Sequence, residues 1–473
     1  MRYPADAMAN ETSTSPRIER ILLREVGPFH EATFEPLPPT GPGELVLFEG
    51  PNGSGKTTIL EGIAVLIGSI GTSFALGDTG VATGPPMRSL VGRIRGEEPY
   101  FTVEFTGGGS AVLWAKHKVV EWRGSPEMLT TLAALEKSAG TNAPTDWAAF
   151  AFRGSQPSAN LATDGPKRIE REALRGALSF GEVFPASAEL GQILVNIYYD
   201  HLQAWREAEQ AKGTPSEPEL RRQADAQQAS LDRFARALTD VLERKVTIEF
   251  VPRQRPPVVR FDGEIIPLDL LGEGLRRTLA WLVDLIARLE LTPWKDASRS
   301  PFDQDFWLLL DEIDQSLHPA LQRHILPALR RLFPNARIYA TTHSPFVVAS
   351  APDGCVFPIR PDPETHRVRG PVAPVKLGPG HSLAWAVEEV FDVPSSFVDE
   401  ETIARVEEHK RAVERLRRGQ LEGFDWAAFA ALRAPLVESA GEGRAIVTLQ
   451  EASVRSLIDD GLRDLARAGR EGV

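Results

Sequence analysis

The sequence predicts an α/β fold in which a mixed, mainly parallel sheet is flanked by helices. Short apolar runs of strand length occur at residues 44–49 (ELVLFE) and 306–310 (FWLLL), and uninterrupted apolar strands are typical of sheets buried on both faces. Helical patterning at 319–332 follows the second run and leads to a further strand at 337–340. A strand, a helix and a strand in this order are typical of parallel pairing.

The N-terminal region adds strands of a different kind. Residues 18–26 are typical of a strand, and a second extended run at 32–34 follows a Gly-Pro turn. Residues 100–105 and 110–115 alternate around a run of glycines and predict a hairpin. We therefore expect an antiparallel β subdomain beside the main sheet.

The middle of the chain predicts a short helical insertion. Leu231, Phe234, Leu238 and Leu242 recur at helical spacing, and strands return at 245–251 and 258–266. The expected division of the chain is a flexible tail at 1–17, a first lobe at 18–195, the insertion at 196–243, a second lobe at 244–358 and a mainly helical C-terminal region at 359–473.

The C-terminal region carries two groups of large apolar side chains. The first lies around Trp385 and Val390, and the second contains Phe424, Trp426 and Phe429. Burial against the two lobes is the simpler expectation, and an exposed groove for a partner is the alternative.

Composition and charge limit the classes of function. The chain has 473 residues with 53 basic and 65 acidic side chains, a formal net charge of −12. This balance excludes binding of nucleic acid by bulk charge alone but not by a local basic groove. Cys355 is the single cysteine, which excludes an intrachain disulfide and a multi-cysteine zinc site. With neither a signal-peptide core nor a run of roughly 20 apolar residues, we expect a cytoplasmic protein without a membrane segment.

The most specific motif follows the first buried strand. Residues 50–57 (GPNGSGKT) match the P-loop pattern G-x-x-x-x-G-K-[ST], and a helix predicted at 57–67 completes its context. The backbone N–H groups of such a loop surround phosphates, while Lys56 would neutralise the β- and γ-phosphates and Thr57 would hold Mg²⁺. The candidate ATP-binding residues here are Gly50, Pro51, Asn52, Gly53, Ser54, Gly55, Lys56, Thr57 and Thr58.

An acidic pair and a histidine complete the predicted catalytic set. The 306–310 run delivers Asp311 and Glu312 to the carboxyl end of a buried strand, where open α/β sheets bind ligands. We expect Asp311 to position Mg²⁺ and Glu312 to act as general base on the attacking water. His343 ends the next strand, so we expect it beside the γ-phosphate and in catalysis with Glu312 and Lys56.

The order of these motifs resembles that of an ABC-type ATPase head. Residues 271–276 (LGEGLR), the acidic pair, 314–319 (DQSLHP) and His343 follow one another as in that class. The runs DEIDQSLHP and TTHSP resemble the branch that contains RecF, the structural-maintenance-of-chromosomes (SMC) proteins and the overcoming-lysogenization-defect (OLD) nucleases. Within it, the short insertion and helical tail are most similar to PtuA-like ATPases of bacterial anti-phage systems.

The resemblance implies a homodimer of heads that encloses ATP. In this family the signature segment of one subunit closes over ATP bound to the other, so Gly272, Glu273 and Gly274 would act in trans. Asp314 would lie in the loop across the dimer interface. The family usually has Ser where this chain has Gly272, and the glycine leaves only backbone N–H groups and a helix N-terminus as donors.

The Mg²⁺-contacting glutamine of the family is harder to assign. Gln156 is the candidate metal ligand, and a plain loop residue is the equal alternative. Arg153, three positions earlier, can contact phosphate or DNA, although an arginine in such a loop is more often solvated.

Together these expectations describe an ATP-driven switch that uses ATP and Mg²⁺. The resemblance implies head-to-head dimers or higher oligomers, sensing of nucleic acid or nucleotide state, and control of an effector nuclease encoded nearby in anti-phage defence. Alternatives are a RecF/SMC-like DNA-repair or DNA-binding ATPase, an OLD-type nuclease, a transporter subunit and an ATP-binding scaffold without catalysis. The lack of an Asp-x-Asp cluster after Thr341 disfavours the nuclease, because two-metal cleavage needs several converging carboxylates.

Overall fold

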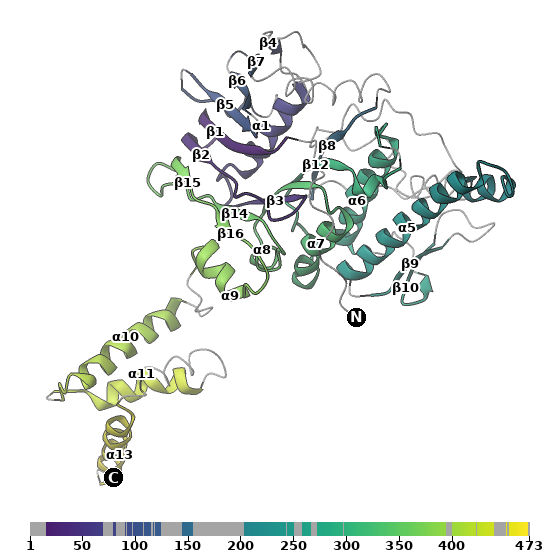
Figure 1. The fold of residues 1–473 in the computed structure, drawn as a ribbon. Coiled ribbons are helices and arrows are strands. Elements are labelled where there is room, and N and C mark those ends of the chain that lie inside the picture. Colours follow the sequence, from purple (N-terminus) through teal and green to yellow (C-terminus); the bar gives the residue numbers. More distant parts are fainter. Residues whose placement is uncertain are drawn as a thin grey trace. The chain divides into compact units, whose positions relative to one another are not determined.

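The computed structural model divides the chain into two compact units, Met1–Phe391 and Asp392–Val473, each described by itself below (Figure 1). The residues that the structure describes are 16–69, 79–81, 90, 92–96, 98–106, 108–114, 117, 119–123, 144–154, 203–242, 244–249, 258–265, 272–296, 298–393, 400–421, 423–438, 451 and 454–471.

The first unit contains a six-stranded sheet with the strand order β16-β14-β3-β13-β12-β8. Strands β8, β12, β13, β3 and β14 run parallel, and β16 pairs antiparallel with β14. The strands are β3 (Glu44–Glu49), β8 (Trp147–Arg153), β12 (Asp305–Asp311), β13 (Arg337–Thr342), β14 (Cys355–Pro358) and β16 (Val375–Lys376). The mainly parallel sheet predicted from the apolar runs is confirmed.

Alternate residues of these strands pack into two different cores. In β3, Leu45 and Leu47 belong to the core on one face of the sheet, whereas Val46 and Phe48 belong to the core on the other. Every residue of β12 is buried. Burial on both faces explains why these strands are continuously apolar rather than alternating.

A second sheet has seven strands in the order β15-β2-β1-β5-β6-β7-β4. Its pairs are antiparallel except that of β15 with β2. The strands are β1 (Ile18–Val26), β2 (Phe29–Phe34), β4 (Thr79–Val81), β5 (Tyr100–Phe105), β6 (Gly109–Trp114), β7 (Val119–Arg123) and β15 (Val368–Val372). This sheet is the antiparallel subdomain that the sequence predicts.

Helix α1 (Lys56–Ser69) joins the two sheets. Its Ile59 and Ile63 belong to the core that both sheets share. A Cβ atom at Gly62 would stand 2.4 Å from the Phe101 ring, so the absence of a side chain lets the helix approach β5 closely. The P-loop helix is thereby held between two rigid layers.

Helices cover the opposite face of the six-stranded sheet. Helices α6 (Glu273–Leu291), α7 (Pro319–Leu332) and α8 (Pro345–Ala349) contribute to that core, and α5 (Glu217–Leu242) packs against α7 (Figure 1). The described part of the expected insertion, 203–242, is helical except for a turn at 211–216. The small sheet β9 (Val246–Glu249), β10 (Val258–Phe261) and β11 (Glu264–Ile265) follows it.

The first unit extends past the boundary that the sequence places at residue 358. Strands β15 and β16 complete the edges of the two sheets, and the segments α9 (Leu383–Trp385) and η5 (Ala386–Val390) add Ala386 and Val390 to the buried core. The expected boundary falls inside this unit, because β15 pairs with β2, more than 300 residues earlier in the chain, and β16 pairs with the neighbouring strand β14. Trp385 packs on this core, as the simpler expectation proposed.

The second unit is a small helical unit with its own apolar cluster. Its helices are α10 (Glu400–Arg417), α11 (Trp426–Glu438) and α13 (Arg455–Glu471). The cluster contains Val413, Leu416, Phe429 and Ile458, and Phe424 and Trp426 pack against it. The second aromatic group, Phe424, Trp426 and Phe429, therefore packs within this unit.

A partly buried ion-pair group at Glu451 connects helices α10 and α11 of this unit. Glu451 accepts hydrogen bonds from Arg433 Nε at 2.6 Å and Arg433 Nη2 at 2.9 Å, and His409 Nε2 lies 3.0 Å from the same carboxylate. Burial raises the pKa of Glu451, but the hydrogen bonds from His409 and Arg433 outweigh it and lower that pKa to about 2.

Glu451→Gln is expected to destabilise the second unit at pH 7 by on the order of 1.5–3 kcal/mol, the usual contribution of hydrogen bonds to charged groups. Because the folded-state pKa is depressed from 4.5 to about 2, the contribution is complete above pH 4.5 and is lost as the pH falls toward 2. Hydrogen exchange of α10 and α11 peptides, corrected for the intrinsic pH dependence, measures it. Glu414→Gln, which removes an exposed carboxylate of α10, is the control and should change protection little.

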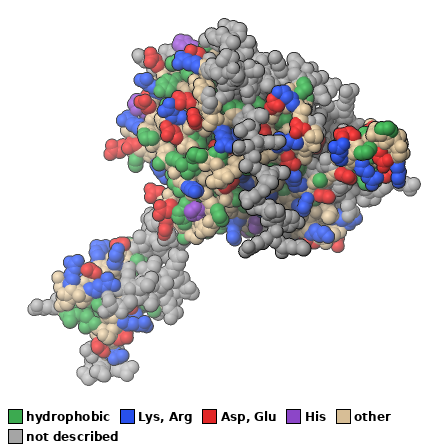
Figure 2. Space-filling view, in the orientation of Figure 1, with side chains coloured by type: hydrophobic (Ala, Val, Ile, Leu, Met, Phe, Trp, Pro, Cys, Tyr) green, Lys and Arg blue, Asp and Glu red, His purple; other side chains and the backbone are tan. Residues whose placement is uncertain are grey.

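The surface shows no single-sign stripe on the face drawn in Figure 2, where basic and acidic side chains of the described residues are intermixed. Within the described parts of the chain, no helix combines the length and apolar character needed to cross a membrane.

Candidate active site

The P-loop connects β3 to α1 at the carboxyl edge of the six-stranded sheet. Gly53 and Gly55 have φ values of 82° and 96°, in the left-handed region that favours glycine. A Cβ atom at Gly55 would also lie 2.4 Å from the Phe29 ring. The loop is thus held against the β1–β2 turn with its backbone curled as phosphate binding requires.

Lys56 is fixed within this loop. Its side chain is buried, and Nζ donates hydrogen bonds to the carbonyl oxygens of Gly50 at 2.8 Å and Pro51 at 3.0 Å. Burial lowers the pKa of Lys56, while nearby carboxylates, led by Glu49, act in the opposite direction. The ammonium group is therefore preorganised at the loop where a phosphate would lie.

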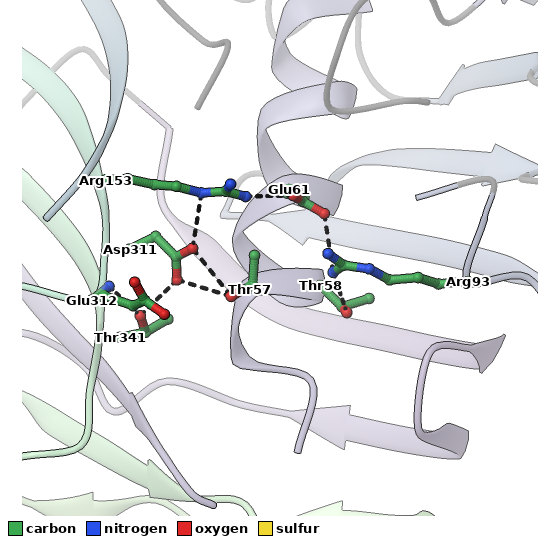
Figure 3. A network of polar contacts seen from close by, with 8 residues as sticks. All are labelled: Thr57, Thr58, Glu61, Arg93, Arg153, Asp311, Glu312 and Thr341. Carbon is green, nitrogen blue, oxygen red and sulfur yellow. Dashed lines mark hydrogen bonds and ion pairs between the residues drawn. The ribbon is translucent and has the colours of Figure 1, made fainter. Parts of the chain in front are cut away.

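Thr57 and Asp311 come together although 254 residues separate them in the chain. Thr57 Oγ1 donates to the two Asp311 carboxylate oxygens at 3.0 and 3.1 Å, and Thr341 Oγ1 donates to Oδ1 at 2.8 Å (Figure 3). A hydroxyl and a carboxylate of this kind are the hard oxygen donors that Mg²⁺ prefers, so the residues present fit this ion. The two side chains predicted to hold Mg²⁺ therefore lie within hydrogen-bond distance of each other.

Glu312 occupies an unusual backbone conformation. Its φ is 56°, its N–H donates to Thr341 Oγ1 at 2.7 Å, and its side chain lines the same cavity as the P-loop. A Cβ atom at Gly154 would stand 2.0 Å from the Glu312 carbonyl oxygen, so β8 ends tightly against this residue. Left-handed conformations of non-glycine residues are costly and concentrate at functional sites.

His343 also lines this cavity. Its backbone N–H points to the Asp314 carboxylate, at 3.2 Å from Oδ1 and 3.3 Å from Oδ2. Burial and then the charge of Lys56 lower the pKa of His343 below its usual value, which favours a neutral ring at pH 7. Asp314 thus fixes the backbone of His343 at the end of β13. Asp314 is not among the described residues that line the cavity.

The cavity measures about 580 Å³, within the range of small-molecule sites. Besides the P-loop, Glu312 and His343, it includes residues that the sequence did not single out, among them Gly27, Pro28, Arg93, Ile94, Arg95 and His366. These come from the β1–β2 turn and from segments that backbone hydrogen bonds tie to it. No local motif identifies them, because these segments meet only through backbone hydrogen bonds between distant parts of the chain.

The signature segment, residues 272–274, lies at the start of α6 and outside the cavity. Gly272 caps the N-terminus of α6, and a Cβ atom at Gly274 would lie 1.9 Å from the Ser316 carbonyl oxygen, so the helix start packs on the loop that follows Glu312. Among the described residues that line the cavity, none belongs to the signature segment. Gln156 lies outside the described residues.

Gly272→Ser is expected to fold and to raise the thermal stability of the first unit. The backbone of Gly272 (φ −55°, ψ 145°) suits any residue, an added Cβ meets no atom within 4 Å, and no side chain now caps α6. Serine at this position can accept a hydrogen bond from the first turn, an improvement of a few tenths of a kcal/mol over glycine. Differential scanning calorimetry measures the shift, and a lowered melting temperature would contradict the open environment of Gly272.

The fold and this site have the features of a P-loop nucleotide-binding domain and are similar to those of ABC-type ATPases. Two family models match parts of the chain: one described as "AAA domain, putative AbiEii toxin, Type IV TA system" over residues 193–349, and one described as "AAA domain" over residues 20–137.

Similar proteins include bacterial retron and Septu components. The chain is 29% identical over 143 residues to the Retron Ec83 probable ATPase of Escherichia coli, covering 30% of this chain and 25% of that protein. It is 28% identical over 131 residues to the Septu protein PtuA of Bacillus thuringiensis, covering 28% of this chain and 32% of that protein. The matches thus span a quarter to a third of these relatives. A solved SMC head bound to the C-terminal winged-helix domain of ScpA aligns with 77% of this chain and 98% of that chain, at 11% identity and a TM-score of 0.40.

Proposed function

We propose that this protein is an ATP-hydrolysing switch whose two heads close around bound ATP. The observation that carries the proposal is the hydrogen-bonded pair of Thr57 and Asp311 beside the buried Lys56, in one cavity with Glu312 and His343. Electrostatic positioning of phosphates is the main requirement for phosphoryl transfer, and this arrangement meets it with preorganised groups.

Each residue has a distinct part in the proposed reaction. The P-loop N–H groups and Lys56 hold the β- and γ-phosphates, and Thr57 and Asp311 hold Mg²⁺. When bound, Mg²⁺ neutralises phosphate charge that develops during transfer. Glu312 accepts a proton from the attacking water, and His343 orients the γ-phosphate from the neighbouring strand.

The position of the signature segment supports the proposed dimer. Because Gly272–Gly274 does not line the cavity of its own chain among the described residues, we propose that it covers the ATP of a second copy. The N-terminus of α6 would then face the γ-phosphate with its free N–H groups.

We further propose a role in anti-phage defence, in which the ATP state controls an effector nuclease encoded nearby. Support comes from the retron and Septu relatives, which match 30% and 28% of this chain. DNA remains a candidate ligand of the closed dimer.

Purified protein tests the proposal directly. Phosphate release with Mg²⁺-ATP should exceed that of a reaction without Mg²⁺, and sedimentation velocity should show a dimer with ATP that reverts with ADP. Absence of phosphate release under both conditions would reject the hydrolytic function, and turnover by a strict monomer would reject the closed dimer.

A further inference from the structure

Arg153 is the residue at the end of β8, directly opposite the Mg²⁺-positioning carboxylate. The register of β8 and β12 pairs Arg153 with Asp311. Arg153 Nε lies 3.2 Å from Asp311 Oδ2, which is the oxygen that also accepts the Thr57 hydroxyl at 3.1 Å (Figure 3). The expectation that this side chain is solvated is wrong, because the strand pairing turns it inward.

A second carboxylate holds the same guanidinium from the other side. Arg153 Nη2 donates to Glu61 Oε1 at 2.8 Å, and Glu61 is almost fully buried on α1, one turn after Thr57. Arg93 Nη1 contacts Glu61 Oε2 at 3.1 Å and donates to Thr58 Oγ1 at 2.8 Å. Asp311, Arg153, Glu61 and Arg93 therefore form a line of alternating charge from the metal-holding pair to the cavity wall (Figure 3).

The positive charge of Arg153 opposes the binding of a divalent cation by Thr57 and Asp311. A guanidinium fixed on Asp311 repels a second positive charge at the same carboxylate, and the burial of Asp311 limits screening by salt. An arginine also offers no lone pair to a metal ion, whereas the amide oxygen of a glutamine does. The strand end next to Asp311 thus carries a positive charge that competes with the cation, three residues before Gln156, the ligand that the resemblance suggests.

We propose that Arg153 is a positioning residue that orients Asp311 toward Thr57 and weakens the affinity of the site for divalent cations. The inference rests on the proposed function, since it assigns a role at the same nucleotide site. In this role Arg153 makes the ATP-bound state depend on the prevailing concentration of Mg²⁺. Glu61 supports this role because it holds the Arg153 guanidinium between its own carboxylate and that of Asp311.

Mn²⁺ binding provides a readout that is independent of turnover. Full-length protein is mixed with the non-hydrolysable analogue AMP-PNP and titrated with Mn²⁺, and free Mn²⁺ is followed by electron paramagnetic resonance. Arg153→Met removes the guanidinium charge without adding an oxygen ligand, and it is expected to bind Mn²⁺ on the order of 10-fold more tightly than wild type because less positive charge lies beside Asp311. Equal or weaker Mn²⁺ binding by a folded Arg153→Met protein would overturn the proposal.

Two further variants control for charge and folding. Arg153→Lys keeps the positive charge and should bind Mn²⁺ as wild type does. Arg330→Gln breaks another partly buried arginine–aspartate pair, with Asp353 at the amino end of the sheet, and should leave Mn²⁺ binding unchanged. If Arg153→Met alone does not fold, Glu61→Gln combined with Arg153→Met removes the unbalanced carboxylate and serves in its place. Failure of wild type to bind Mn²⁺ with AMP-PNP would reject the proposed nucleotide function, whereas wild-type binding with no difference in the variants rejects only the role of Arg153.

Discussion

Lys56→Ala is expected to abolish ATP binding under conditions in which the wild type is saturated. The alanine removes a buried ammonium group that the Gly50 and Pro51 carbonyls hold in place, so no side chain of the P-loop itself neutralises the phosphates. Two charge-assisted contacts of about 1.5–3 kcal/mol each correspond to a loss of at least roughly 100-fold in affinity. Isothermal titration with AMP-PNP and Mg²⁺ measures the change.

A matched lysine variant separates this effect from a general loss of charge. Lys295→Ala removes an exposed ammonium that pairs with Asp146 outside the cavity, and it should bind AMP-PNP with wild-type affinity. Folding of both variants can be compared by circular dichroism. Wild-type affinity in a folded Lys56→Ala protein would show that the phosphates bind elsewhere.

Glu312→Gln is expected to lower turnover by roughly 10²–10⁴-fold, the usual contribution of a general base, while ATP still binds. The substitution preserves the size of the side chain and the hydrogen bond from the backbone N–H of residue 312 to Thr341 Oγ1. The amide cannot accept the proton of the attacking water. Because hydrolysis no longer resets the heads, ATP-bound dimer should accumulate. Single-turnover phosphate release and sedimentation velocity with ATP measure the two effects.

The control for this variant is Glu364→Gln, which neutralises an exposed carboxylate in the turn after β14. It should retain wild-type turnover and the wild-type dimer fraction. Normal hydrolysis by Glu312→Gln would remove Glu312 from the base role. Slow hydrolysis without any gain of dimer would instead show that ATP does not hold two heads together.

Much of the site could be predicted because its chemistry lies in short segments. The P-loop spans consecutive residues, and Asp311 and Glu312 directly follow an apolar strand. Parallel strands bring their carboxyl ends to one edge of a sheet, so predicting the strands already places Lys56, Asp311 and His343 near one another. The structure brings these side chains to the edge that the strand pattern predicts.

Other features depended on pairings between distant segments. Gln156, the candidate for contact with Mg²⁺ that the resemblance implies, lies outside the described residues, and the register of β8 with β12 puts Arg153 at Asp311. The end of the first unit at Phe391 likewise depends on β15 reaching β2.

What the sequence by itself determined was therefore the set of buried strands, the P-loop and the two carboxylates that follow β12, because periodicity and short motifs are local properties of the chain. Only the tertiary structure decided which strand lies beside β12, and hence that a guanidinium borders the carboxylate predicted to position Mg²⁺. Strand order and register depend on packing summed over the whole core, so neighbouring residues along the chain do not specify them.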